Sequence, residues 1–241
     1  MDISTFIFNY REAFGERIEL PIAFWYSDTL EYPTEKVNGC FFKAMGKVRA
    51  GGGISLNADV IGCGGGKLYT GFADMNEFIP NFVSRKEKYK QTPQMVRDYV
   101  EQIGTSRTDK RYLHFARVDG LSSFERVEGM LFLVNPDVLS GLATWTFYDT
   151  NSPDAMVTPF GSGCSSIVTT TALENRQGGK RTFLGLFDPS VRPYFEKDIL
   201  SFAIPMSRFR EMYDTMRQSC LFGTHAWAKV KERIEESAPF L

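Results

Sequence analysis

The segment Met130-Leu131-Phe132-Leu133-Val134-Asn135-Pro136 does more than any other to set the fold of this 241-residue chain. It contains five consecutive apolar residues, and a short apolar run that ends at turn residues is typical of a strand buried on both faces. Proline is common in the first turn of a helix, where its missing N–H costs nothing. We therefore predict a buried strand over residues 127–134 and a helix over residues 137–145.

Outward from this segment, apolar periodicity and turn residues predict the remaining elements. Residues 167–173 fit either a strand or a helix. Because strands and helices are intermingled along the chain, the fold class is α/β (or α+β), with a mixed sheet in a single domain over residues 1–241. Strands are expected at 22–26, 68–72, 182–187 and 200–204, and helices at 4–17, 40–48, 93–103, 209–220 and 224–237.

Composition excludes several classes of function. The chain has 28 Lys and Arg against 29 Asp and Glu, a formal charge of −1, so it lacks an overall basic surface and we expect no nucleic-acid partner. Its apolar runs are far shorter than the ~20 residues of a membrane helix, so we expect no membrane partner. Because the chain begins without a secretory signal, we expect a cytoplasmic protein with reduced thiols. With only His114 and His225, a histidine-based metal site is excluded, and His114 is interpreted as a satisfied strand residue.

The two halves of the chain share landmarks in the same order, which predicts an internal duplication. The two copies are expected over residues 21–140 and 141–220, as α/β units packed together and followed by a C-terminal helix at 224–237. A basic insertion at 84–111, with eight Lys and Arg against four Asp and Glu, would lie in the first copy and is interpreted as a solvated face. The main paired landmarks are Gly39-Cys40 with Gly163-Cys164, Gly65-Gly66-Lys67 with Gly178-Gly179-Lys180, and Tyr69–Asp74 with Phe183–Asp188.

Short motifs spread over most of the chain carry a resemblance to a known family. They are Pro21-Ile22-Ala23, Gly39-Cys40 with Gly46 downstream, Cys63-Gly64-Gly65, Gly163-Cys164 and Ile204-Pro205. In these motifs the chain resembles the uncharacterised domain-of-unknown-function family 169. The family has no established activity to transfer, so the resemblance implies only that the cysteines and glycine-rich loops are candidate functional residues.

Three of the four cysteines, Cys40, Cys63 and Cys164, stand beside glycine, whereas Cys220 lies on the apolar stripe of a helix and is expected in the core. Thiolates are ligands of zinc and iron–sulfur centres, and helix N-termini stabilise them. We therefore predict that these three residues share a site for a metal, either zinc or an iron–sulfur cluster, or for a small ligand. Two alternatives stay open. The cysteines are isolated structural residues, because their spacing matches no compact metal motif, or Cys164 is the nucleophile of a thiol-dependent transferase or hydrolase.

The two glycine-rich segments with lysine suggest another function, that of a non-catalytic anion or cofactor binder. They are Gly64-Gly65-Gly66-Lys67 and Gly178-Gly179-Lys180. Glycines let backbone N–H groups approach an oxyanion, and lysine adds positive charge. No Ser or Thr follows either lysine, so neither segment is a Walker loop, and the structural alternative is a tight turn that leads into a strand. The sequence names no reaction and no protein partner.

Overall fold

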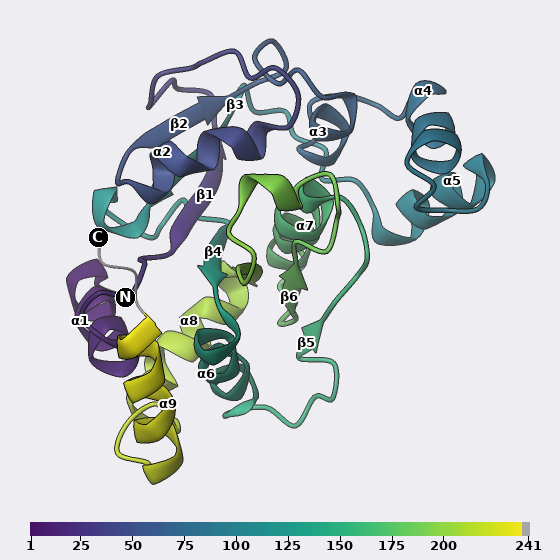
Figure 1. Ribbon diagram of the computed structural model, residues 1–241. Helices are drawn as coiled ribbons and strands as arrows, with labels where there is room; N and C mark the ends of the chain where they lie inside the picture. Colours follow the sequence, from purple (N-terminus) through teal and green to yellow (C-terminus); the bar gives the residue numbers. More distant parts are fainter. Residues whose placement is uncertain (238–241) are drawn as a thin grey trace.

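A seven-stranded mixed sheet runs through the computed structural model, which describes residues 1–237 (Figure 1). The strand order is β2-β3-β1-β4-β7-β6-β5, and every neighbouring pair is antiparallel except β5 and β6. The α/β fold class with a mixed sheet is therefore confirmed. The strands are β1 (Ile22–Ser27), β2 (Gly53–Leu56), β3 (Tyr112–Arg117), β4 (Gly129–Val134), β5 (Met156–Val157), β6 (Thr182–Gly185) and β7 (Leu200–Pro205).

Strand β4 lies in the middle of the sheet, and all six of its residues are buried, as the apolar run predicts. Met130, Phe132 and Val134 belong to the core on one face of the sheet. Leu131 and Leu133 belong to the core on the other face. This alternation follows the two-residue period of a strand, so β4 separates the two helical layers.

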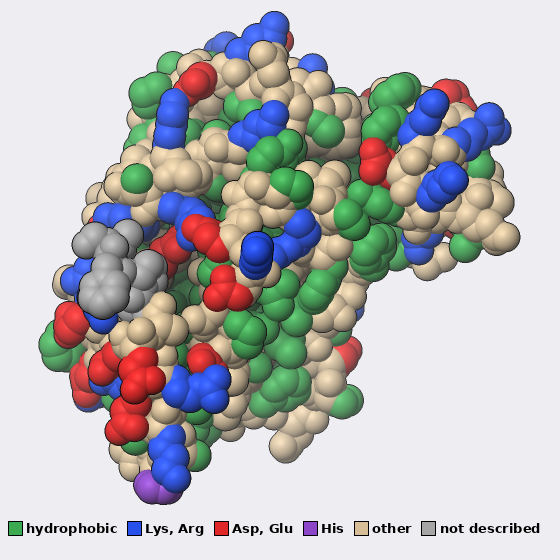
Figure 2. All heavy atoms as spheres, in the orientation of Figure 1, with side chains coloured by type: hydrophobic (Ala, Val, Ile, Leu, Met, Phe, Trp, Pro, Cys, Tyr) green, Lys and Arg blue, Asp and Glu red, His purple; other side chains and the backbone are tan. Residues whose placement is uncertain are grey.

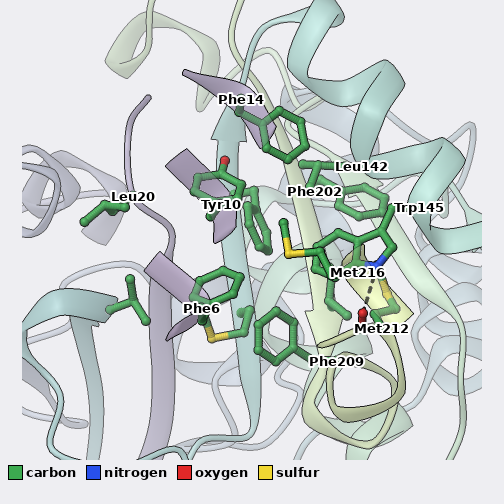
Figure 3. Packing of buried hydrophobic residues seen from close by; sticks show 14 of the residues in the cluster. Phe6, Tyr10, Phe14, Leu20, Leu142, Trp145, Phe202, Phe209, Met212 and Met216 are labelled. Atoms are coloured by element: carbon green, nitrogen blue, oxygen red, sulfur yellow. Dashed lines mark hydrogen bonds between the residues drawn. The ribbon is translucent and has the colours of Figure 1, made fainter. Parts of the chain in front are cut away.

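The first helical layer encloses an aromatic core (Figure 3). Phe6, Tyr10 and Phe14 of the N-terminal helix pack into it without exposure to solvent. Trp145 lies beside them and donates from its indole Nε1 to the backbone oxygen of Met212 at 2.8 Å. Much of the large phenylalanine content is therefore core packing. The helices of this layer are α1 (Ile3–Phe14), α6 (Pro136–Phe147), α8 (Met206–Thr215) and α9 (His225–Ser237).

The second layer covers the opposite face and carries a protruding arm, seen at the upper right of Figure 1. We define the arm as α4 (Phe78–Asn81), the π-helix η2 (Phe82–Lys86) and α5 (Pro93–Ile103). The layer itself consists of η1 (Phe41–Ala44), α2 (Met45–Arg49), α3 (Gly64–Tyr69), the π-helix η4 (Ser165–Thr169) and α7 (Thr170–Arg176). The remaining short helices are η3 (Val118–Gly120), η5 (Arg192–Tyr194) and η6 (Met216–Gln218).

The strand predicted over residues 68–72 is wrong, because this segment is the end of α3 and the turn that follows it. Cys63 caps the helix by accepting the Gly66 N–H at its Sγ, 3.4 Å away. Thr70 closes it by donating from Oγ1 to the Gly66 oxygen at 2.7 Å. A Cβ on Gly66 would lie only 3.0 Å from Ile61, so close packing selects glycine despite its low helix propensity.

The sheet order gives the two halves a matching topology. If the two-residue edge strand β5 is left aside, the first strand of each half is innermost, the second is outermost and the third lies between them. These strands are β1, β2 and β3 in one half and β4, β6 and β7 in the other. In both halves, the connection between the first two of these strands contains a helix that begins after a cysteine. These helices are η1, after Cys40, and η4, after Cys164. This correspondence keeps Gly39-Cys40 with Gly163-Cys164 but separates the halves between β3 and β4, not at residue 140.

The paired Gly-Gly-Lys segments are not structural equivalents. Gly65-Gly66-Lys67 lies inside α3, whereas Gly178-Gly179-Lys180 is the turn between α7 and β6. Tyr69–Asp74 is likewise a helix end and turn, whereas its partner segment contains β6. The sequence alignment of the copies is therefore wrong at these positions, and a duplication remains a proposal that the strand topology supports.

His114 on β3 is fully buried, and both of its ring nitrogens have partners. Nε2 lies 2.8 Å from the Ser27 hydroxyl, and Nδ1 lies 2.8 Å from the Ser55 hydroxyl. Burial lowers the pKa of the imidazole, and the nearby Glu31 carboxylate only partly opposes this effect. The expected satisfied strand histidine is confirmed.

We expect the stability of the protein to fall as the pH drops below about 6.5, the ordinary histidine pKa, in part because of His114. The unfolded imidazole binds a proton more readily than the buried one, so protonation favours unfolding. Urea unfolding between about pH 8 and pH 5 measures this dependence. His114→Gln should show a shallower slope, and equal slopes in the two proteins would contradict the assignment.

Candidate functional site

Each of the three glycine-flanked cysteines stands immediately before a helix. Cys40 precedes η1, Cys63 precedes α3 and Cys164 precedes η4. The first backbone N–H groups of a helix have no partner within it, so they favour negative charge on a nearby sulfur. The Gly66 N–H already donates to Cys63 Sγ.

The fold brings these three cysteines together although 23 and 101 residues separate them along the chain. Burial is the largest cause of the raised pKa of Cys40 and of Cys164. The charge of a Cys63 thiolate raises the pKa of Cys40 further. The charges of Cys40 and Cys63 thiolates do the same for Cys164. Gly65 lies between two of the sulfurs. Its oxygen is 4.0 Å from Cys164 Sγ, and a Cβ at this position would lie 3.8 Å from Cys63 Sγ.

Cys164 is the innermost of the three. It is buried, with Sγ 3.2 Å from the Ser162 hydroxyl, and it leads into a π-helix, a rare element that is frequent at functional sites. Burial strongly raises the pKa of its thiol and raises that of Cys40 to about 11. Both thiols are therefore protonated at neutral pH. Cys220 lies elsewhere, partly buried against the first core.

Asp188 lies near this site, although the sequence marked it only as the last residue of a paired landmark and not as a site residue. It follows β6, it is only 3% exposed, and its charge raises the pKa of both Cys40 and Cys164. Two residues before it, Leu186 is buried with a φ of 67°, a left-handed backbone conformation that is strained for a branched residue. The available signal was an aspartate placed at the end of a short strand, which is too common to select.

The arm reaches the site through Tyr89, which follows η2. Burial and, next to it, the charge of Asp188 raise the pKa of Tyr89 to about 12. Its ring also meets Phe160 edge-on, with the ring centroids 6.1 Å apart. The space-filling view shows the arm as a separate lobe with Lys and Arg side chains on its outer surface (Figure 2). Its inner end therefore meets the loops around the cysteines.

The geometry does not present a ready single-ion site. Among residues 1–237, no group of three or more His, Cys, Asp or Glu side chains is placed to hold a metal ion. Over the same residues, none of the helices has the length and apolar character needed to cross a membrane.

The residues of the second Gly-Gly-Lys segment already make contacts within the protein. Lys180 pairs with Glu211 at 2.6 Å and donates to the Ser207 oxygen at 2.7 Å. Gly178 has a φ of 68°, and a Cβ on Gly179 would clash with Glu174. The glycines are explained by the tight turn. In the first segment, Gly64, Gly65 and Gly66 are helical residues beside the cysteines, with Lys67 in the last turn of α3.

A cavity of about 610 Å³ lies between the end of α5 and the β5–β6 edge of the sheet. Thr170, Glu174 and Arg181 are among its lining residues, and the Arg181 guanidinium already pairs with Glu174. None of the four cysteines lines this cavity. The cysteine site is therefore separate from it.

Comparison with known proteins gives one match. No curated protein and no solved structure matches the chain. The family model of domain-of-unknown-function family 169, described as an uncharacterised ArCR, matches residues 18–215, a span that contains all three site cysteines and Asp188. With most of its length matched, the chain belongs to domain-of-unknown-function family 169.

Proposed function

We propose that this protein binds an iron–sulfur cluster through the thiolates of Cys40, Cys63 and Cys164. The observation that carries the proposal is the convergence of these three cysteines, each placed before a helix, from distant parts of the chain. Thiolates are the usual protein ligands of such clusters. The four cysteines are all free, as expected in the reducing cytoplasm where we place the protein.

The ligand search favours a cluster over a single ion. In a tetrahedral site with Zn–S bonds of ~2.3 Å, the sulfurs lie roughly 4 Å apart. Among residues 1–237, no group of three or more His, Cys, Asp or Glu side chains is placed to hold one metal ion in this way. A cluster bonds each cysteine to a different iron, so its protein sulfurs are spread more widely.

The protonation of the thiols also supports ligand chemistry rather than nucleophilic chemistry. A nucleophilic cysteine needs a lowered pKa, whereas burial raises that of Cys164. Iron displaces the thiol protons when it binds, so a raised pKa makes binding depend on pH without preventing it. We therefore place cluster binding ahead of a thiol-dependent transferase or hydrolase.

The test is anaerobic reconstitution of the full chain with ferrous iron and sulfide. The wild-type protein should take up iron and acid-labile sulfide together and show visible thiolate-to-iron charge-transfer absorption. Cys40→Ser/Cys63→Ser/Cys164→Ser should lose this absorption, because a serine hydroxyl is a poor substitute for a thiolate.

Cys220→Ser is the matched control, since Cys220 is a free cysteine outside the site. It should bind as much iron as the wild type. Circular dichroism checks that the triple variant is folded. A folded wild-type protein that takes up no iron and sulfide would overturn the proposal.

A further inference from the structure

We propose that the cavity between the end of α5 and the β5–β6 edge binds a small organic acid, with the carboxylate of the ligand on the Arg181 guanidinium. The apolar body of the ligand lies against the wall of the cavity. The cavity volume of about 610 Å³ falls within the range of roughly 300–1,000 Å³ in which proteins bind small molecules. This is a second site, separate from the cysteines and independent of the proposed cluster.

Arg181 is fixed in place by a buried carboxylate. Glu174 is 6% exposed, and its Oε2 accepts from Arg181 Nε at 3.1 Å and from Nη2 at 2.7 Å. The other carboxylate oxygen, Oε1, accepts the Arg181 backbone N–H at 3.0 Å. These bonds set the plane of the guanidinium, so it is oriented before a ligand arrives.

The Gly178-Gly179-Lys180 turn makes this pairing possible. The Gly179 N–H donates to the Glu174 backbone oxygen at 2.8 Å, and a Cβ on Gly179 would clash with the Glu174 side chain. Glycine therefore lets the carboxylate pass under the turn and reach Arg181, which follows directly. The turn serves the site by placing this arginine, whereas Lys180 pairs with Glu211.

The free edge of the guanidinium has room for a second carboxylate. Within residues 1–237, Arg181 Nη1 donates to no protein acceptor, and the side chain is 50% exposed. On this edge Nη1 and Nη2 present two parallel N–H groups, which match the two oxygens of a carboxylate. A singly charged carboxylate fits better than a doubly charged phosphate, because the ion pair with Glu174 leaves little net positive charge.

Apolar side chains from three elements form much of the wall. Ile103 ends α5, Leu173 lies on α7 and Phe183 lies on β6. Gly104 follows α5 with a φ of 78°, and a Cβ there would lie 2.9 Å from Leu173, so glycine lets α5 approach α7 closely. Contact with this wall removes apolar ligand surface from water. The ligand is therefore charged at one end and apolar at the other.

Glu101 is the third charged residue of the lining, and it is exposed. Its carboxylate repels a carboxylate ligand, although solvent screens the effect. Glu101→Gln should therefore tighten binding about twofold, a change of the size seen for exposed charge pairs. Weaker binding in this variant would contradict the proposed ligand.

Three matched probes separate the charge of the ligand from its apolar body. Isovalerate has both, isovaleramide keeps the shape without the charge, and acetate keeps the charge without the body. Saturation-transfer NMR titrations of the full chain, at neutral pH and constant ionic strength, give the dissociation constants. Isovalerate should bind at one saturable site. The amide and acetate should each bind about tenfold more weakly, the change expected for one charged hydrogen bond or a few buried methylene groups.

Arg181→Gln/Glu174→Gln removes both charges together, so no buried carboxylate is left unpaired. It should weaken isovalerate binding about tenfold and change isovaleramide binding by less than about twofold. Arg233→Gln/Asp137→Asn is the matched control, because it removes an arginine–carboxylate pair outside the cavity. It should bind isovalerate as the wild type does.

Thr158→Trp tests the cavity without removing a buried group. Thr158 is an exposed residue of the lining, so the indole should fill part of the cavity and block isovalerate. Thr34→Trp, at an exposed threonine outside the cavity, should have no effect. Circular dichroism checks that the variants are folded. The proposal is overturned if isovalerate does not bind saturably, if its amide binds equally well, or if Thr158→Trp leaves binding unchanged.

Discussion

Trp145→Ala should lower the free energy of unfolding by about 3–5 kcal/mol, the range for removal of a large aromatic side chain from a core. Trp145 is fully buried in the first core, where its ring packs edge-on against Phe209. Its Nε1–H bond to Met212 also ties α6 to α8. The substitution leaves a cavity, and the Met212 oxygen loses its bond from Trp145 and keeps the longer one from the Thr215 hydroxyl at 3.4 Å. Urea unfolding followed by far-ultraviolet circular dichroism measures the loss.

Two variants on the same helix separate these contributions. Trp145→Phe keeps most of the buried ring and should lose only about 1–3 kcal/mol, since the Met212 oxygen loses the closer of these two donors. Phe147→Ala removes a side chain that is 38% exposed and should change the stability by about 0.5 kcal/mol or less. If Phe147→Ala destabilised the protein as much as Trp145→Ala, burial would not explain the effect.

Residues whose local pattern and final surroundings agree were predictable from the sequence. The apolar run of β4 is buried on both faces because a hydrophobic core lies on each side of the sheet, and strands β1 and β7 pair with its two edges. Pro93 begins α5 after Thr92, whose hydroxyl accepts the Met95 N–H at 3.2 Å. In each case the signal lies within a few residues.

The errors arose where packing opposes local preference. Glycines 64–66 were interpreted as a tight turn that leads into a strand, yet they form the first turn of α3, because the helix packs closely against Ile61 and Cys63 caps it. The two-residue strand β5 was also not predicted. It is held by pairing with β6, a contact that no local pattern encodes.

The candidate site was half predictable. Glycine beside Cys40, Cys63 and Cys164 singled these residues out, and the fold brings them together. Asp188 could not be selected, because an acidic residue after a strand is ordinary until its burial is known. The site therefore depends on long-range topology, above all on the two halves meeting between β1 and β4.

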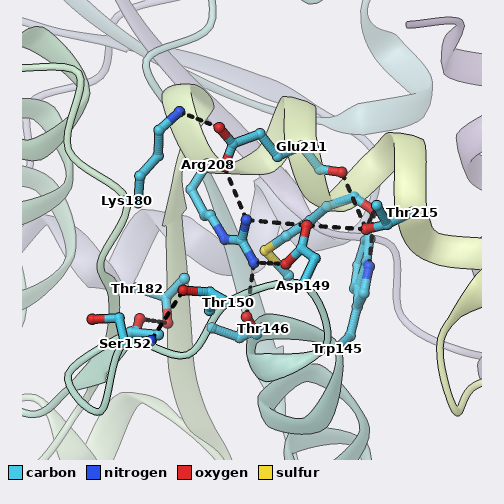
Figure 4. A network of polar contacts seen from close by, with 12 residues as sticks. Trp145, Thr146, Asp149, Thr150, Ser152, Lys180, Thr182, Arg208, Glu211 and Thr215 are labelled. Carbon is cyan, nitrogen blue, oxygen red and sulfur yellow. Dashed lines mark hydrogen bonds and ion pairs between the residues drawn. The ribbon is translucent and has the colours of Figure 1, made fainter.

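Arg208 lies at the centre of a network of polar contacts in the second half of the chain (Figure 4). It lies on α8 and is only 3% exposed. Its guanidinium pairs with Asp149 after the end of α6, donates to the Thr146 oxygen at 2.8 Å and pairs with Glu211 at 2.9 Å. Lys180 joins the network through Glu211. One side chain therefore links α6, α8 and the turn before β6.

Arg208→Met should lower the free energy of unfolding by about 3 kcal/mol. The methionine fills much of the same volume, but the Thr146 oxygen loses this donor, and the Asp149 carboxylate loses its cation and is left with the Thr215 hydroxyl at 3.4 Å. Removal of one partner from a buried pair typically costs about 3–5 kcal/mol, and we place this case at the lower end because Asp149 retains 20% exposure. Urea unfolding at neutral pH measures the change, and a loss below about 1 kcal/mol would contradict it.

The pH dependence and a second substitution show whether the loss of stability comes from the Asp149 carboxylate that Arg208→Met leaves without its cation. Burial raises the pKa of Asp149, but the bonds and charge of Arg208 more than offset this, so the folded value lies below the ordinary 3.8. The pair therefore stabilises the protein above pH 3.8, and this contribution disappears as the pH falls through the lowered pKa. The cost of Arg208→Met should shrink in acid.

Arg208→Met/Asp149→Asn should likewise be at least about 1 kcal/mol more stable than the sum of the two single changes predicts, because neither variant residue then leaves a charge unpaired. Additive losses that do not vary with pH would instead assign the effect of Arg208 to packing alone.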